Sequence, residues 1–194
     1  MTKIGSDWIA RNWFRVMVGR NSDNQKRKYL HQFIYDLDRR KIESFISPNL
    51  ISPIGVLNII RNFTDWTSDD DVWQTPEHWL QSEHQIYDLM VTGKDDCDGL
   101  SVAGISILSS FGYQNAQLCL CQYGENLIDK WQYNHLIGLF YDQTLPNDPF
   151  IMEFTADAIL KKIPRLSECP DYDLFISANK TGDYYLWRDQ CLND

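Results

Sequence analysis

Apolar residues in the first third of the chain recur at helical spacing. They form one-sided stripes in residues 6–20, 24–46 and 55–63, so we expect three helices and a helical N-terminal part that spans residues 1–63. The second stripe consists of Leu30, Phe33, Ile34 and Leu37.

A further apolar stripe predicts a central helix later in the chain, and Gly112 stands where that helix should end. The stripe comprises Leu100, Ala103, Gly104, Ile107, Leu108 and Phe111. Before it, the acidic run 69–71 predicts a loop, and Thr75 followed by Pro76 predicts the start of another helix.

The pattern changes to strands after the central helix. Residues 116–123 alternate, with Leu118 and Leu120 on one face and Cys119 and Cys121 on the other. Further strands are expected at 135–141 and 150–154, and a hairpin is expected from 174–178 and 184–187. Helices followed by antiparallel strands predict an α+β fold, and 194 residues suit a single domain.

Composition and charge exclude several classes of protein. A net charge of −9 argues against nucleic-acid binding, and we interpret the basic residues 26–28 and 39–41 as a solvated helix face. No stretch of the sequence is apolar enough to span a membrane, and we expect no signal peptide. Its five cysteines are an odd number without a dense framework, which predicts reduced thiols and a cytoplasmic location.

Cys97 is the strongest candidate for chemistry. It falls in the first turn of the expected central helix, where unpaired backbone N–H groups and the helix dipole favour a thiolate and can stabilise an oxyanion. Of the four histidines, His135 alone begins a strand that follows this helix, so we expect it to be the base. Glu153 lies 18 residues further on and can orient the imidazole if residues 135–141 and 150–154 pair.

Each of these residues also has a purely structural interpretation. Cys97 could be a small buried hydrophobe, His135 a structural residue at a strand end, and Glu153 a solvent-facing carboxylate. Their order along the chain and their spacing together favour the catalytic interpretation. Cys119 and Cys121 lack neighbouring ligand residues, so we interpret them as buried thiols and not as a zinc site.

The region from Trp73 to Phe154 resembles the bacterial transglutaminase-like cysteine proteinases of the papain-like/transglutaminase superfamily. The lead-in Trp73–Leu80 is similar to the family's W-x-T-P-x-E-F-L, and Asp95–Gly99 is similar to its G-D-C-[ED]-D nucleophile motif. Asn134-His135-Leu136 and Phe150–Phe154 resemble its histidine and acid strands.

This resemblance implies a helix bearing the cysteine packed on an antiparallel sheet, with residues 73–190 as the catalytic core. It also implies a Cys97-His135-Glu153 triad that performs thiol-dependent acyl transfer on an amide of a protein or peptide substrate. The reaction would be that of a cysteine peptidase or amidase, or that of a transglutaminase.

The sequence departs from the family pattern at several positions. Asp95 replaces a usual glycine, Gly99 replaces a usual aspartate, and Glu153 replaces an aspartate. Some relatives bind calcium beside the cysteine. Asp96 and Asp98 match part of that pattern, but Leu100 or Ser101 stands where a third ligand is usual, so no metal and no other cofactor is expected. Gln81 and Gln85 are candidates for the second oxyanion donor.

Two alternatives remain open. The run Asp96-Cys97-Asp98-Gly99-Leu100 and the strand from His135 also resemble the NlpC/P60 peptidases, although the cysteine-to-histidine gap there is usually longer. The other alternative is a papain-like binding module that has lost its chemistry. The presence of all three catalytic residue types argues against that module.

Overall fold

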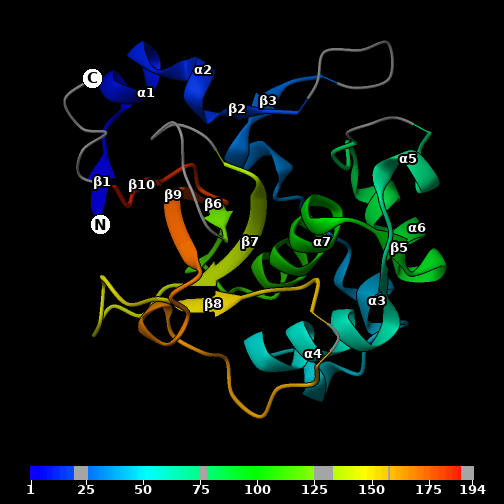
Figure 1. Cartoon of the computed structure of the whole chain (residues 1–194). Helices are drawn as coiled ribbons and strands as arrows, with labels where there is room; N and C mark the ends of the chain where they lie inside the picture. The colour runs from blue at the N-terminus through cyan, green and yellow to red at the C-terminus, as the bar shows by residue number, and fades with distance from the viewer. Residues whose placement is uncertain (20–25, 75–77, 125–132, 157, 189–194) are drawn as a thin grey trace.

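A six-stranded antiparallel sheet forms the centre of the protein (Figure 1). The structure is a computed structural model that describes residues 1–19, 26–74, 78–124, 133–156 and 158–188. In spatial order the strands are β1 (Thr2–Ile4), β10 (Tyr184–Leu186), β9 (Tyr172–Asn179), β6 (Ala116–Tyr123), β7 (His135–Phe140) and β8 (Phe150–Met152). Two small sheets pair β2 (Met17–Val18) with β3 (Lys28–Tyr29) and β4 (Asp65–Trp66) with β5 (Lys94–Asp95).

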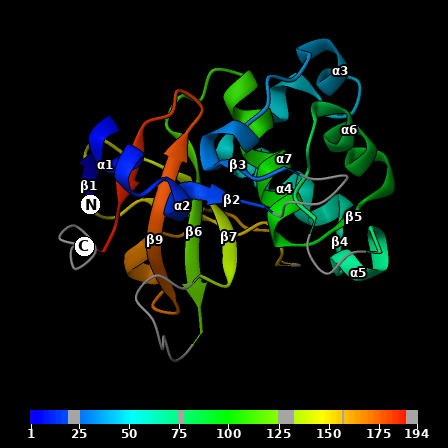
Figure 2. The same ribbon diagram turned by 90° about the horizontal axis from the view of Figure 1, so that it is seen from above.

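Most of the helices lie together on one side of this sheet (Figure 2). They are α3 (Arg39–Glu43), α4 (Pro53–Phe63), α5 (Asp69–Val72), α6 (Glu83–Thr92) and α7 (Cys97–Ser110). The short helices α1 (Ser6–Arg11) and α2 (Trp13–Val16) lie near β1, and 3-10 turns occur at Leu30–Phe33, Pro48–Leu50 and Leu166–Glu168. The α+β prediction is therefore confirmed.

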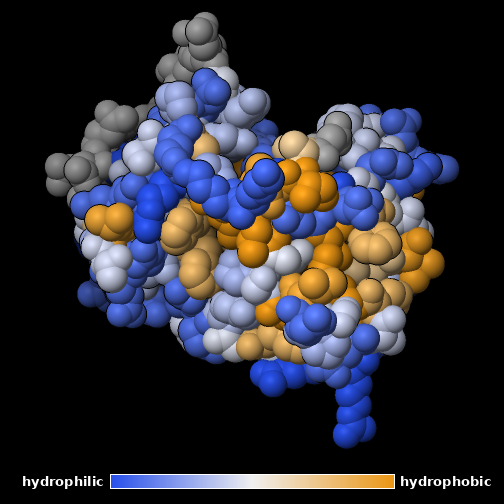
Figure 3. All heavy atoms as spheres, turned by 90° about the horizontal axis from the view of Figure 1, so that it is seen from below, coloured by the Kyte–Doolittle hydropathy of each residue, from blue (hydrophilic) through white to orange (hydrophobic). Residues whose placement is uncertain are grey.

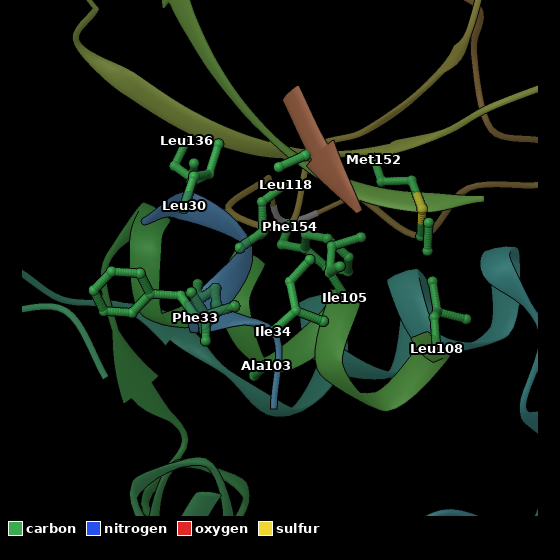
Figure 4. Packing of buried hydrophobic residues seen from close by; sticks show 14 of the residues in the cluster. Leu30, Phe33, Ile34, Ala103, Ile105, Leu108, Leu118, Leu136, Met152 and Phe154 are labelled. Atoms are coloured by element: carbon green, nitrogen blue, oxygen red, sulfur yellow. The ribbon is translucent and has the colours of Figure 1, made fainter. Parts of the chain in front are cut away.

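The central helix α7 approaches β7 closely because glycines stand at the contact. A Cβ added to Gly104 would lie 2.3 Å from the ring of Phe154, and one added to Gly138 would lie 2.7 Å from Ile105. Figure 4 shows Ile105 and Phe154 within the apolar layer between helix and sheet. This close packing fixes the position of the helix relative to the strand that carries His135.

The strand predictions agree well with the structure. Strand β6 spans the predicted residues, and β9 with β10 forms the predicted hairpin. Leu118 and Leu120 belong to the main core beneath α7, whereas Cys119 and Cys121 belong to a smaller cluster that also contains Ile137. The alternation of side chains along β6 thus separates two apolar layers.

The long helix expected over residues 24–46 is wrong. The described part of this segment contains β3, a 3-10 turn and α3, although Leu30, Phe33, Ile34 and Leu37 are all buried as the stripe indicated. The backbone N–H groups of Tyr35 and Leu37 donate to the hydroxyls of Ser106 and Ser110 on α7. Hydrogen bonds to another element therefore replace the bonds of a continuous helix.

Three other predictions fall in the N-terminal half of the chain. The helix expected over 6–20 is interrupted at Asn12 and ends at Val16, after which the chain enters β2. The acidic run 69–71 is not a loop, because it forms most of α5. The helix start expected at Thr75 and Pro76 lies outside the described residues.

Candidate functional site

Cys97 is the first residue of α7, and the residue before it caps the helix. The carboxylate of Asp96 accepts a hydrogen bond from the backbone N–H of Asp98 at 3.1 Å. Cys97 therefore lies at the positive end of the helix dipole, among N–H groups that have no acceptor within the helix.

His135 is the first residue of β7, and a buried hydrogen bond ties its strand to the first turns of α7. The hydroxyl of Ser101 donates to the backbone carbonyl of Leu136 at 2.9 Å. The side chains of His135 and Cys97 line the same cavity, and Cys97 contributes to the raised pKa of His135. The local geometry thus places the thiol beside the imidazole.

Glu153 follows β8 directly and contacts the other side of the imidazole. Strands β7 and β8 pair antiparallel, with Gly138 opposite Met152, so the start of β7 lies beside the residues that follow β8. The distance between His135 Nε2 and Glu153 Oε2 is 2.6 Å, and the two side chains are 13% and 12% exposed. The structure therefore brings together all three residues that the sequence analysis singled out.

The charged forms of His135 and Glu153 stabilise each other. Burial acts to lower the pKa of His135, but the hydrogen bonds to Cys97 and Glu153 and the nearby negative charge raise it to about 10. Burial acts to raise the pKa of Glu153, and the contacts with His135 and Thr155 outweigh that effect and hold it below its usual range. An imidazolium facing a carboxylate is the favoured state near neutral pH.

An acidic cluster adjoins Cys97, because both neighbours of Cys97 in the chain belong to it. It consists of Asp69, Asp95, Asp96 and Asp98, whose carboxylate oxygens approach within 4.8 Å of one another. Asp95 and Asp98 are 0% and 4% exposed, and each has one oxygen without a hydrogen-bond partner among the described residues. Burial raises the pKa of Asp95 to about 7 and raises that of Asp98 well above its usual range.

The two departures from the family's nucleophile motif, at Asp95 and Gly99, are related. A Cβ added to Gly99 would lie 2.2 Å from the carboxyl carbon of Asp95, so the glycine makes room for that carboxylate. Asp69 joins the cluster because β4, which precedes α5, pairs with β5. Sequence reasoning missed Asp69 as a member of this site, because no local motif links it to the cysteine, and it treated Asp95 only as a departure from the family motif.

The two glutamines proposed as oxyanion donors are engaged elsewhere. The side-chain N–H of Gln81 donates to the carbonyl of Trp79 at 2.9 Å. The amide nitrogen of Gln85 lies 3.0 Å from Nε2 of His78, whose ring stacks on Trp73 at 4.2 Å. Both glutamines therefore help to hold the lead-in segment in place.

A cavity of about 190 Å³ opens at the thiol. Its lining consists of Trp79, Asp96, Cys97, Asp98, Tyr133, Asn134, His135 and Leu136. A larger hollow of about 610 Å³ lies between α4 and β8, away from Cys97. Figure 3 shows apolar side chains on the lower face of the molecule. The titratable side chains of Asp96, Cys97, Asp98 and His135 converge on the smaller cavity.

Solved structures of similar shape identify the fold. Legionella pneumophila LapG in its calcium-bound form superposes with a TM-score of 0.53 at 19% identity, covering 76% of this chain and 74% of that one. The EGTA-treated form gives a TM-score of 0.54 at 17% identity, covering 79% and 75%. LapG is a transglutaminase-like cysteine protease.

The chain has a papain-like/transglutaminase-like fold. The similarity shows the fold, and no protein-family model and no curated protein matches the sequence. No described helix is long and apolar enough to cross a membrane.

Proposed function

We propose that the protein catalyses thiol-dependent acyl transfer on an amide bond of a protein or peptide. The observation that carries this proposal is the 2.6 Å contact between His135 and Glu153, with the imidazole beside Cys97 at the start of α7. In this scheme Cys97 is the nucleophile, His135 is the base and Glu153 orients the imidazole. We place the chemistry in residues 73–190 of a single domain that spans residues 1–194.

The proposed reaction proceeds in two halves. His135 holds the proton of Cys97, and the thiolate attacks the amide carbonyl carbon to form a tetrahedral oxyanion, which the backbone N–H of Cys97 stabilises. His135 then protonates the leaving amine or ammonia as the C–N bond breaks, and a thioester remains. Water or a second amine, deprotonated by His135, releases the acyl group.

The imidazole of His135 can serve both proton transfers because its two nitrogens have different partners. Glu153 engages Nε2 at 2.6 Å, which leaves Nδ1 for the thiol and the leaving group. The carboxylate stabilises the imidazolium that forms when Cys97 loses its proton.

The acidic cluster fits a divalent cation with oxygen ligands, such as calcium. Asp69, Asp95, Asp96 and Asp98 would hold it, and the unpartnered buried oxygens of Asp95 and Asp98 support this assignment. A bound cation would neutralise the concentrated negative charge next to Cys97 and fix the start of α7. This assignment extends the sequence-based expectation, which included no metal.

A thiol-reactive probe tests the proposal without knowledge of the substrate. Cys97 and Cys169 are both partly buried, so Cys169 is a matched internal control for access. We expect iodoacetamide at neutral pH to alkylate Cys97 at least about tenfold faster than Cys169, as read by mass spectrometry. The variant His135→Gln should remove this difference, whereas His84→Gln, at an exposed position, should keep it.

Equal rates for Cys97 and Cys169 would contradict the proposal and favour the catalytically silent binding module. An NlpC/P60-type peptidase shares the thiol chemistry, so the choice of substrate separates it from the proposed activity. Cleavage of cell-wall peptides but not of protein substrates would favour that alternative.

A further inference from the structure

Glu153 receives more hydrogen bonds than its contact with His135 requires. Its Oε1 accepts from the backbone N–H of Thr155 at 2.9 Å and from the Thr155 hydroxyl at 2.6 Å. Its Oε2 accepts from the Tyr172 hydroxyl at 2.7 Å, in addition to its contact with His135 Nε2. Both oxygens are therefore held by groups other than the histidine.

Tyr172 reaches Glu153 from a distant strand. It is the first residue of β9, and β6 lies between β9 and the strand of His135. Its ring lies 4.9 Å from that of Tyr123 and 6.3 Å from the imidazole, between ring centroids, and Tyr123 lies 5.9 Å from the imidazole. This aromatic packing limits the positions that the Tyr172 hydroxyl can adopt.

The Tyr172 and Thr155 donors to the Glu153 carboxylate are neutral. Burial, together with the charge of Glu153, raises the pKa of Tyr172, so its hydroxyl remains a donor. A cation in its place would compete with the imidazolium for the carboxylate. Arg61, the nearby cation, donates instead to the backbone carbonyls of Glu153 and Ala158, at 2.6 and 2.7 Å. Within the described part of the chain, the carboxylate is thus oriented without a second cation at its oxygens.

We propose that Tyr172 is a positioning residue of the thiol site. Its hydroxyl, together with Thr155, holds the Glu153 carboxylate in the orientation that forms the hydrogen bond with His135 Nε2. This inference rests on the proposed function. It also gives a reason for the unusual glutamate. A glutamate has one more rotatable bond than an aspartate, so it needs additional anchors to present one oxygen in a fixed direction.

The test compares two tyrosines that differ in their relation to Glu153. Tyr172→Phe removes the hydroxyl that contacts the carboxylate and keeps the ring. Tyr123→Phe is the matched control, because Tyr123 packs against the same imidazole and against Tyr172 itself, but its hydroxyl makes no contact with Glu153 among the described residues. Both variants are measured for thermal midpoint, for the iodoacetamide rate at Cys97 and for the imidazole N–H signal of His135 by NMR.

We expect Tyr172→Phe to slow alkylation of Cys97 about fivefold and to broaden the Nε2–H signal of His135, while Tyr123→Phe leaves both unchanged. The double variant Tyr172→Phe/Thr155→Val should be slower still. An unchanged or faster rate in Tyr172→Phe, or an equal effect of Tyr123→Phe, would overturn the inference. If wild-type Cys97 already reacts no faster than Cys169, the proposed function itself fails, and that result is distinct from the others.

Discussion

The two sides of the candidate site differ in how many hydrogen-bond donors their buried carboxylates have. On the sheet side, the buried carboxylate of Glu153 has hydrogen-bond donors at both of its oxygens. On the helix side, the acidic cluster brings together four carboxylates, and oxygens of Asp95 and Asp98 have no described partner. A carboxylate with a full set of donors is stable when ionised, whereas crowded and unpartnered carboxylates are costly.

The difference separates what the fold provides by itself from what it leaves to a ligand. The sheet side can orient the imidazole with groups of the chain alone. The helix side gains stability when a proton or a cation compensates the buried charge. We therefore expect the sheet side to respond to the loss of individual donors and the helix side to respond to added cations.

The largest expected effect is a cation response of the acidic cluster. Calcium at about 100 times its dissociation constant should stabilise the protein by about 2.7 kcal/mol relative to EGTA. For a domain of this size the midpoint of thermal unfolding should rise by about 5–10 °C. Differential scanning calorimetry in calcium chloride, magnesium chloride and EGTA measures the response and its selectivity.

Two aspartate variants locate this response. Asp98→Asn should abolish it and should cost the EGTA-treated protein little stability, because the variant removes a buried negative charge and leaves an amide oxygen that can still accept from the backbone N–H of Gly99. Asp142→Asn is the control outside the cluster, because Asp142 is already paired with Arg165 at 2.8 Å. A thermal midpoint that calcium does not move, or a response that survives in Asp98→Asn, would contradict the proposed contrast.

The sequence predicted the local elements of the site better than the contacts between distant strands. Strand β6 and the hairpin of β9 and β10 follow from local alternation and turn residues, and Cys97, His135 and Glu153 stand in recognisable local patterns. Asp69 and Tyr172 have no such signal, because each reaches the site through pairing between distant strands.

The mistaken helix at 24–46 has the same kind of cause. Helical spacing correctly marked Leu30 and Phe33 as buried. It could not show that Tyr35 and Leu37 donate their backbone hydrogen bonds to serine hydroxyls on α7. Hydropathy patterns report which side chains are buried, whereas the backbone partners depend on elements that are remote in the sequence.

A smaller effect is expected from the pH dependence of the sheet side. The pKa of His135 is raised to about 10, so its contribution to stability is complete below its ordinary pKa of 6.5 and is lost as the pH rises towards 10. Glu153 has a lowered pKa, so its contribution is complete above its ordinary pKa and is lost as the pH falls. Both contributions are complete between about pH 4.5 and 6.5.

Urea unfolding at a series of pH values measures the histidine contribution. Between pH 6.5 and 8.0 the wild-type protein should lose about 2 kcal/mol more stability than His135→Gln, in which this titration is absent. Running both proteins in EGTA keeps the acidic cluster the same in each. Parallel curves for the two proteins over this range would show that the ion pair with Glu153 does not hold the imidazolium.

The smallest predicted effect compares one local motif at a buried and at an exposed position. Thr155 donates its N–H and hydroxyl to Glu153, and Thr144 makes the same two bonds to Asp142, at 2.9 and 2.7 Å. Thr155→Val should cost about 1 kcal/mol, because it leaves a buried carboxylate short of a donor, whereas Thr144→Val should cost less than about 0.5 kcal/mol because water can replace the hydroxyl. Equal losses of stability in urea unfolding would mean that the buried carboxylate of Glu153 depends on its donor no more than the exposed carboxylate of Asp142 does. The contrast between the two sides of the site would then lose its physical basis.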